Sequence, residues 1–220
     1  MSSDVPTLAS QQLEGRALDG RSLGKRGALT RQRLLDATAM LLETHGVRDL
    51  RVVDIAREVG TSPATFYQYF RDVEEAVLVL AEGVAEDLTP LADALSRPWS
   101  GDDGIKAARM MVRAFMDLWD RHRAVVRTRN LAAQEGDPRF RDVRNASLRP
   151  LTLALAERVR DSQRAGAVAP GHSPVAAAAA LVAMTERMAA FHREVEELGM
   201  SRDELVETTA QIIARTTTGA

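Results

Sequence analysis

The chain of 220 residues contains no cysteine, and only 4% of its residues are aromatic. Without cysteine it has neither disulfides nor thiolate metal sites. The longest apolar run, Val175–Met184, covers ten residues and includes five consecutive alanines. That run is too short for a membrane span, which needs about 18 apolar residues, and the first thirty residues contain no apolar signal segment. We therefore expect a cytoplasmic protein without a membrane partner.

Enzymatic motifs are also missing. None of the four histidines follows a glutamate by three residues, so the Glu-x-x-His pairs of helical di-iron enzymes are absent. No cysteine nucleophile exists, and no glycine-rich phosphate loop follows a strand. The sequence therefore predicts no catalytic residues, no metal site and no cofactor.

Alanine and leucine dominate the apolar residues, which make up 45% of the chain, and this composition favours helices over sheet. We predict an all-α protein, in which residues 1–26 form a flexible basic arm. The net charge is only −2, but residues 16–33 carry six basic side chains against one acidic one. The alternative for this arm is an ordinary solvated tail.

Helical periodicity, together with the glycines and prolines that end helices, predicts where the helices lie. A helix is predicted from Gly27 to His45 with Gly46 ending it, then two short helices over Val52–Val59 and Ser62–Tyr69. Later helices are expected over 73–88, 105–121, 123–134, 138–165, 174–198 and 202–216. Pro90 should end or kink the first of these, and Pro150 should bend the 138–165 helix.

The two short helices joined at Gly60 match a helix-turn-helix. Ser62 is a candidate N-cap and Pro63 a natural first helical residue. Phe66 and Phe70 are spaced to face the core. Both tyrosines lie beside them, where packing does not explain their presence, whereas contact with phosphate and thymine does.

This segment resembles the DNA-binding domain of the tetracycline-repressor (TetR) family over roughly residues 31–77. The resemblance is carried by Leu34-Leu35, Ala37, Leu41-Leu42, Gly46, Val52, Asp54-Ile55-Ala56, Val59-Gly60, Ser62, Thr65, Tyr67, Tyr69-Phe70 and Glu74-Glu75. It implies an all-helical homodimer with a three-helix, helix-turn-helix head and a larger, variable C-terminal helical bundle. The expected division is a flexible basic arm at 1–26, a DNA-binding domain at 27–72, and an effector-binding and dimerisation domain at 73–220. Two positions depart from the family pattern: Arg51 replaces a threonine and Val73 replaces a lysine, so which cations contact the DNA backbone is open.

The resemblance implies a regulator that binds double-stranded, palindromic operator DNA and is released by a small apolar or amphipathic effector, as most family members are repressors. We expect Pro63, Ala64, Thr65 and Gln68 near base edges, with Gln68 pairing adenine. The full set of expected DNA contacts is Arg51, Ser62, Pro63, Ala64, Thr65, Tyr67, Gln68, Tyr69, Lys25 and Arg26. The alternative is a helical protein-interaction module in which the tyrosines bind another protein.

For the effector we expect a pocket walled by methionines and aromatics with a few polar side chains. The candidates are Met111, Phe115, Trp119, Asn130, Thr152, Met184, Thr185 and Met188. Such stripes also occur in ordinary cores. Small residues suit close helix approach at a dimer interface, for which the candidates are Ala176, Ala180, Ala183, Leu205 and Ile212. Close packing within one subunit is the alternative there.

Overall fold

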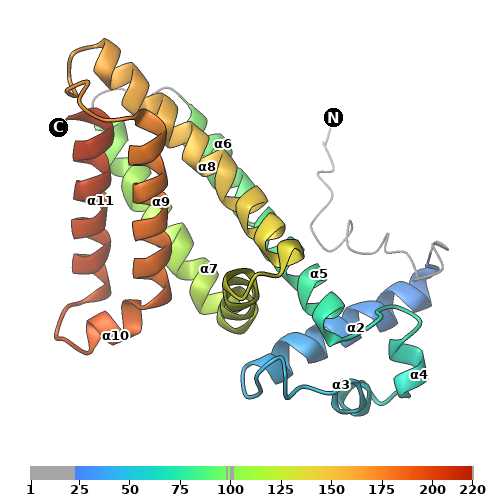
Figure 1. Ribbon diagram of the computed structural model, residues 1–220. Coiled ribbons are helices and arrows are strands. Elements are labelled where there is room, and N and C mark those ends of the chain that lie inside the picture. The colour runs from blue at the N-terminus through green and yellow to red at the C-terminus, as the bar shows by residue number, and fades with distance from the viewer. Residues whose placement is uncertain (1–22, 98, 100–101, 220) are drawn as a thin grey trace, which may run out of the picture. The chain divides into compact units, whose positions relative to one another are not determined.

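A computed structural model describes residues 23–97, 99 and 102–219, and every regular element in these ranges is a helix (Figure 1). This confirms the predicted all-α class. The helices are α2 (Lys25–Leu42), α3 (Val52–Val59), α4 (Pro63–Phe66), α5 (Val73–Glu86), α6 (Thr89–Ser96), α7 (Asp103–Gln134), α8 (Pro138–Arg164), α9 (Pro174–Ala190), α10 (His192–Glu196) and α11 (Arg202–Thr218). Among the described helices, none combines the length and apolar character that crossing a bilayer requires.

The chain forms two compact units. The first contains residues up to Glu82 together with Ala124–Phe140, and the second contains Gly83–Arg123 and the residues from Arg141 onward. We call them the head unit and the second unit. Helices α7 and α8 each contribute residues to both. The domain boundaries predicted after residues 26 and 72 remain a proposal. They did not anticipate that residues 124–140 belong to the head unit.

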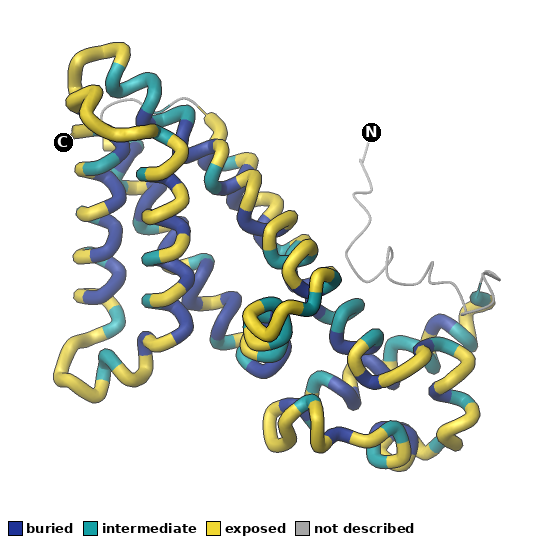
Figure 2. Tube along the Cα trace, viewed as in Figure 1, coloured by how far each residue is buried: buried dark blue, intermediate teal, exposed yellow. Residues whose placement is uncertain are grey.

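In the head unit, α2 and α3 bury the apolar faces that their spacing predicts. Leu34 and Leu35 of α2 are buried, as are Ile55, Ala56 and Val59 of α3 (Figure 2). Gly60 then turns the chain with φ +72° and ψ 39°, in the left-handed region that favours glycine. The predicted bounds of α3 and the role of Gly60 are confirmed.

The neighbouring helices differ from the predicted bounds. Helix α2 begins at Lys25 rather than at Gly27, so Lys25 and Arg26 of the expected flexible arm are helical, and it ends at Leu42 rather than at His45. Gly46 is not among the glycines with positive φ, so it is not a left-handed helix cap. Helix α4 ends at Phe66 rather than at Tyr69. Residues 67–69 continue as hydrogen-bonded turns, with the Gln68 and Tyr69 amides donating to Thr65 and Phe66 carbonyls. These i→i−3 bonds tighten the end of a short helix.

The second unit differs from prediction mainly at its joints. Pro90 lies in the first turn of α6, where its missing N–H removes no helical bond, so the chain breaks just before it. The predicted break at residue 122 is present: His122 has non-helical φ −129° and ψ 28° and divides α7 into two helical stretches. The helix expected to reach Leu198 stops at Ala190, because Phe191 leaves helical geometry before α10 begins. Pro150 lies inside α8.

The second unit buries most of its apolar side chains along α7, α8, α9 and α11. Helices α9 and α11 contact each other and run side by side (Figure 1). Fully buried positions include Met111, Met116, Leu151, Leu155 and Ile213. By contrast, several alanines of α9 stay exposed along one face (Figure 2). This unit therefore has a packed interior and an outer face of small side chains.

Candidate DNA-binding surface and effector groove

The start of α4 is organised as the sequence predicted. The Ser62 hydroxyl accepts a hydrogen bond from the Thr65 amide at 3.2 Å, and Pro63 occupies the first turn. Ser62, Pro63 and Ala64 are exposed, and Thr65 is half-buried. The helix start therefore presents backbone and small side chains that can approach another molecule closely.

Two phenylalanines fix this segment from behind. Phe66 and Phe70 are buried, with ring centroids 5.4 Å apart. The guanidinium of Arg31 lies 5.2 Å from the Phe70 centroid and joins α2 to this pair. Tyr67 keeps 52% of its surface exposed, and Gln68 is also exposed. The aromatic cluster is thus divided into a buried pair and an outward-facing surface.

The start of α2 lies next to the same surface. A Cβ placed on Gly27 would lie 3.6 Å from the hydroxyl of Tyr69, which is half-buried. Lys25 and Arg26, two and one residues earlier, are exposed. The structure therefore brings these two predicted cations close to the predicted tyrosine. Residues 1–22 of the expected basic arm lie outside the described residues.

Arg51 takes the N-cap position of α3, where its extended backbone starts the helix without a side-chain cap. Its side chain is exposed, as a phosphate contact requires. At the other end of α3, the Arg33 guanidinium donates to the Val59 carbonyl at 2.9 Å and ties α2 to the turn. Every predicted DNA-contact residue within the described range is at least partly accessible.

The head unit also contains a polar cluster that the sequence reasoning missed. The Asp72 carboxylate accepts from the Glu75 amide at 2.7 Å and caps α5, as predicted. Arg139, at the start of α8, contacts both Glu74 and Asp137. The Asp137 hydrogen bond, followed by that of Glu74, raises the pKa of Arg139, and Arg139 in turn lowers the pKa of Asp137. No short-range spacing links residues 65 positions apart, so nothing in the sequence indicated this pair.

The predicted effector residues occupy several environments. Met111, Phe115 and Trp119 are buried on α7, and the Trp119 indole N–H has no hydrogen-bond acceptor among the described residues. Thr185 is buried with its hydroxyl donating to the Leu181 carbonyl, so it has no free donor for a ligand. Met184 and Met188 are half-buried. Asn130 belongs to the head unit, whereas the other predicted pocket residues belong to the second unit.

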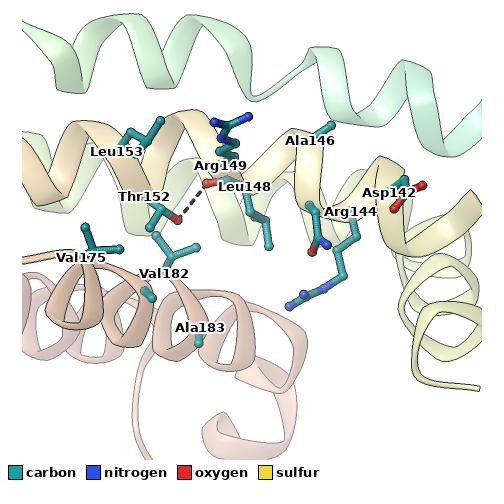
Figure 3. Close-up of a pocket in the computed structure, with 12 residues that line it drawn as sticks. Asp142, Arg144, Ala146, Leu148, Arg149, Thr152, Leu153, Val175, Val182 and Ala183 are labelled. Carbon is teal, nitrogen blue, oxygen red and sulfur yellow. Dashed lines mark hydrogen bonds between the residues drawn. The ribbon is translucent and has the colours of Figure 1, made fainter. Parts of the chain in front are cut away.

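A groove of about 680 Å³ lies between α8 and α9. Figure 3 shows Leu148 and Thr152 of α8 directed toward α9, with Val182 of α9 directed back toward α8. Arg149 and Leu153 lie on the side of α8 away from α9. The Thr152 hydroxyl donates to the Leu148 carbonyl at 3.0 Å. Of the predicted effector residues, only Thr152 lines this groove.

The predicted dimer residues do not all share one environment. Ala176, Ala180 and Ala183 are exposed on α9, and Ile212 on α11 is 45% exposed. Leu205 is only 5% exposed, so it belongs to the core of its own protomer and offers little surface to a partner. Ala183 also lines the groove.

A charged cluster joins α7 to the α10–α11 region of the second unit. Asp120 accepts hydrogen bonds from Arg193 at 2.9 Å and Arg202 at 2.6 Å. The buried His192 lies between Asp120 and Glu196, at 3.1 and 2.8 Å. Burial opposes ionisation of Asp120, but hydrogen bonds from Arg193 and Arg202 prevail and lower its pKa to about 2. No group of three or more potential metal ligands occurs in the described ranges.

Similarity to known proteins agrees with this arrangement. Residues 34–77 match the family described as bacterial regulatory proteins, tetR family. Residues 88–220 match the tetracyclin repressor-like C-terminal domain. The transcriptional regulator EthR of Mycolicibacterium smegmatis is 26% identical over 207 residues, covering 94% of this chain and 93% of that protein. EthR of Mycobacterium tuberculosis H37Rv is 27% identical over 172 residues, covering 76% and 78%.

Solved structures share the fold at lower identity. A TetR-family regulator from Rhodococcus superimposes with a TM-score of 0.66 at 17% identity, covering 86% of this chain and 99% of the other. FadR of Bacillus subtilis, solved with stearoyl-CoA, gives 0.63 at 13% identity, covering 86% and 98%. The predicted resemblance is confirmed: the chain belongs to the TetR family of helix-turn-helix transcriptional regulators.

Proposed function

We propose that the protein is a homodimeric repressor that binds a palindromic operator through α4 and its flanks and leaves it when a small effector binds. The observation that supports this most directly is the divided aromatic cluster. Phe66 and Phe70 are buried, while Tyr67 and Gln68 on the same segment face outward. A short helix held in this way can enter a major groove without losing its own core.

The contacts we assign follow from exposure and chemistry. Gln68 is the candidate for a bidentate contact to adenine, and Pro63, Ala64 and Thr65 face neighbouring base edges. Phosphates would be held by cations and hydroxyls around this centre. These are Arg51, Ser62, Tyr67, Tyr69, Lys25 and Arg26, all accessible at least in part.

For the dimer we propose the exposed face of α9 and α11. Ala176 and Ala180 allow a partner helix to approach closely, and Ile212 supplies an apolar side chain. Leu205 is left out because it is buried within the protomer. A twofold dimer presents two heads and therefore reads a twofold-symmetric site.

For the effector we propose the groove between α8 and α9. Its volume of about 680 Å³ falls within the range of about 300–1,000 Å³ usual for small-molecule sites. Leu148, Val182 and Val175 give it apolar walls, and Thr152 and Arg144 add polar atoms. This composition suits an amphipathic molecule. Among the structural relatives, FadR is described with stearoyl-CoA and SmeT with triclosan, which are ligands with large apolar parts.

The test is the salt dependence of DNA binding. A duplex enriched from a random library by the full-length protein should bind more tightly than a shuffled duplex, with the logarithm of affinity falling steeply against the logarithm of salt concentration. If the protein instead serves as an interaction module, the two duplexes will bind equally weakly. A shift of the bound duplex to the free state on adding an amphipathic probe such as lauric acid would support the effector proposal.

A further inference from the structure

The start of α8 carries a compact ionic arrangement, which we call the Arg139 clamp and define as Asp137, Arg139 and Glu74. The Asp137 carboxylate accepts from the Arg139 amide at 2.9 Å, from Nε at 3.2 Å and from Nη2 at 2.7 Å. The same Nη2 donates to Glu74 at 3.0 Å. Because Asp137 binds one edge of the guanidinium through both Nε and Nη2, Arg139 reaches Glu74 from a preset position.

Glu74 lies in the first turn of α5, immediately after the segment assigned to DNA contact. In that turn, Asp72 caps the Glu75 amide, and Glu75 accepts from the Arg71 amide at 2.6 Å. Val73 is buried. The first turn of α5 is therefore bonded to Arg71, the residue that follows Phe70. We expect a displacement of Glu74 to be passed through this turn to residues 62–70, which we call the recognition segment.

A buried side chain lies next to the Arg139 clamp in the sequence. Phe140, the next residue of α8, is 2% exposed and belongs to the head unit, as do Glu74 and Arg139. A second ion pair joins Arg48, which is 79% exposed, to Glu135 at 2.8 Å, and single surface pairs contribute little. Glu74 is itself 58% exposed, but the Arg139 pair differs because Asp137 also holds the same guanidinium.

We propose that Arg139 is a positioning residue for operator binding, acting through Glu74 to hold the first turn of α5 and, with it, the recognition segment in the DNA-binding arrangement. The proposal rests on the proposed DNA-binding function.

A simple charge effect and a positioning effect predict opposite changes in the DNA affinity of one variant, Glu74→Ala. Glu74 is a negative charge close to the DNA-binding segment, so its removal should strengthen binding to a polyanion if only electrostatics matters. If Arg139 positions α5 through its contact with Glu74, then Glu74→Ala should weaken binding to the selected duplex. The direction of the effect thus separates the two explanations.

The experiment measures binding of the full-length protein to its selected duplex and to a shuffled duplex, for Glu74→Ala, Arg139→Ala and the double variant. We expect each single variant to lose about fivefold in affinity for the selected duplex, the order expected for coupled neighbours, and the double variant to lose no more than the weaker-binding single variant. Matched controls are Arg141→Ala, an exposed arginine two residues further along α8, and Glu58→Ala, an exposed acid on α3.

Equal losses in Arg139→Ala and Arg141→Ala, additive losses in the double variant, or tighter binding by Glu74→Ala would each overturn the inference. The melting temperature of every variant, measured without DNA, shows whether a loss of affinity is caused by unfolding. If Arg139→Ala unfolds the protein, Arg139→Lys is the milder substitution to measure. Lysine keeps the charge but lacks the planar guanidinium that binds Asp137 through Nε and Nη2, so an intermediate loss supports the proposal and no loss contradicts it. Failure of the wild-type protein to prefer its duplex would instead refute the proposed function itself.

Discussion

The two units differ in how far apart in sequence their key residues lie. In the head unit, the buried and exposed parts of the recognition surface come from the few residues between Ser62 and Phe70. In the second unit, several ion pairs join helices that are far apart in the sequence, as in the pairs Asp120–Arg202 and Arg109–Glu207. The surface that we assign to base contacts in the head unit is thus one local motif, whereas the second unit depends on helix packing that no single segment determines.

The largest effect should come from removing a buried ring in the head unit. Phe66→Ala empties a fully buried position and should lower the free energy of unfolding by about 3–5 kcal/mol, with loss of DNA binding. Tyr67→Ala, one residue later and half exposed, should cost at most about 1 kcal/mol in stability while still weakening DNA binding. Urea denaturation and DNA affinity measured on both variants would show this division. Equal destabilisation by the two changes would contradict it.

Two leucines on α8, one buried and one exposed, allow the same comparison of stability in the second unit. Leu155 is fully buried, and Leu153, two residues earlier, is 51% exposed. Leu155→Ala should cost about 2–5 kcal/mol in unfolding free energy, and Leu153→Ala about 0.5 kcal/mol or less. Thermal and urea denaturation will compare them. A large cost for Leu153→Ala would mean that its side chain is covered in solution.

Base reading by Gln68 should appear as a change in specificity rather than in fold. Gln68→Ala should reduce discrimination at one base pair by about 1–3 kcal/mol, because one bidentate pair is lost. Binding to a panel of single-base operator variants measures this. Uniform weakening on all duplexes would show that Gln68 contacts only the backbone.

The smallest effect concerns acid stability of the second unit. The pKa of Asp120 is lowered to about 2 in the folded protein. A depressed carboxyl pKa stabilises the fold above its unfolded value and loses that contribution as pH falls toward the folded value. The Asp120 cluster should therefore weaken between about pH 4 and pH 2, by at most about 1 kcal/mol for a solvent-screened cluster. Melting temperatures of wild type and Asp120→Asn should converge over that interval, and a constant difference would refute this assignment.

The head unit could be predicted well because its determinants are local. The Gly60 turn, the Ser62 cap and the burial of Phe66 and Phe70 all follow from neighbouring residues, and the structure shows each of them. Helix ends were less predictable. Helix α2 stops at Leu42, and the Glu43 and Thr44 amides then donate to the Met40 and Leu41 carbonyls in turns, so the helix ends in tighter bonds that the side-chain pattern does not mark.

In the second unit, sequence periodicity identified helices but not their partners. The stripe of Met111, Phe115 and Trp119 has the spacing of a pocket wall, yet all three side chains are buried in the core. The groove instead uses Leu148, Val175 and Val182, which carry no distinctive motif. Arg139 was missed for the same reason, since an ion pair over 65 residues is set by tertiary structure alone.

The most direct test of the account is selection of binding sites from a random duplex library by the full-length protein. The account predicts enrichment of an inverted repeat whose half-sites lie about one helical turn, roughly 10 base pairs, apart or a multiple of it. The same selection with Gln68→Ala should relax one symmetric pair of positions. Recovery of no enriched sequence, or of a single unrepeated site, would contradict a paired helix-turn-helix reading operator DNA.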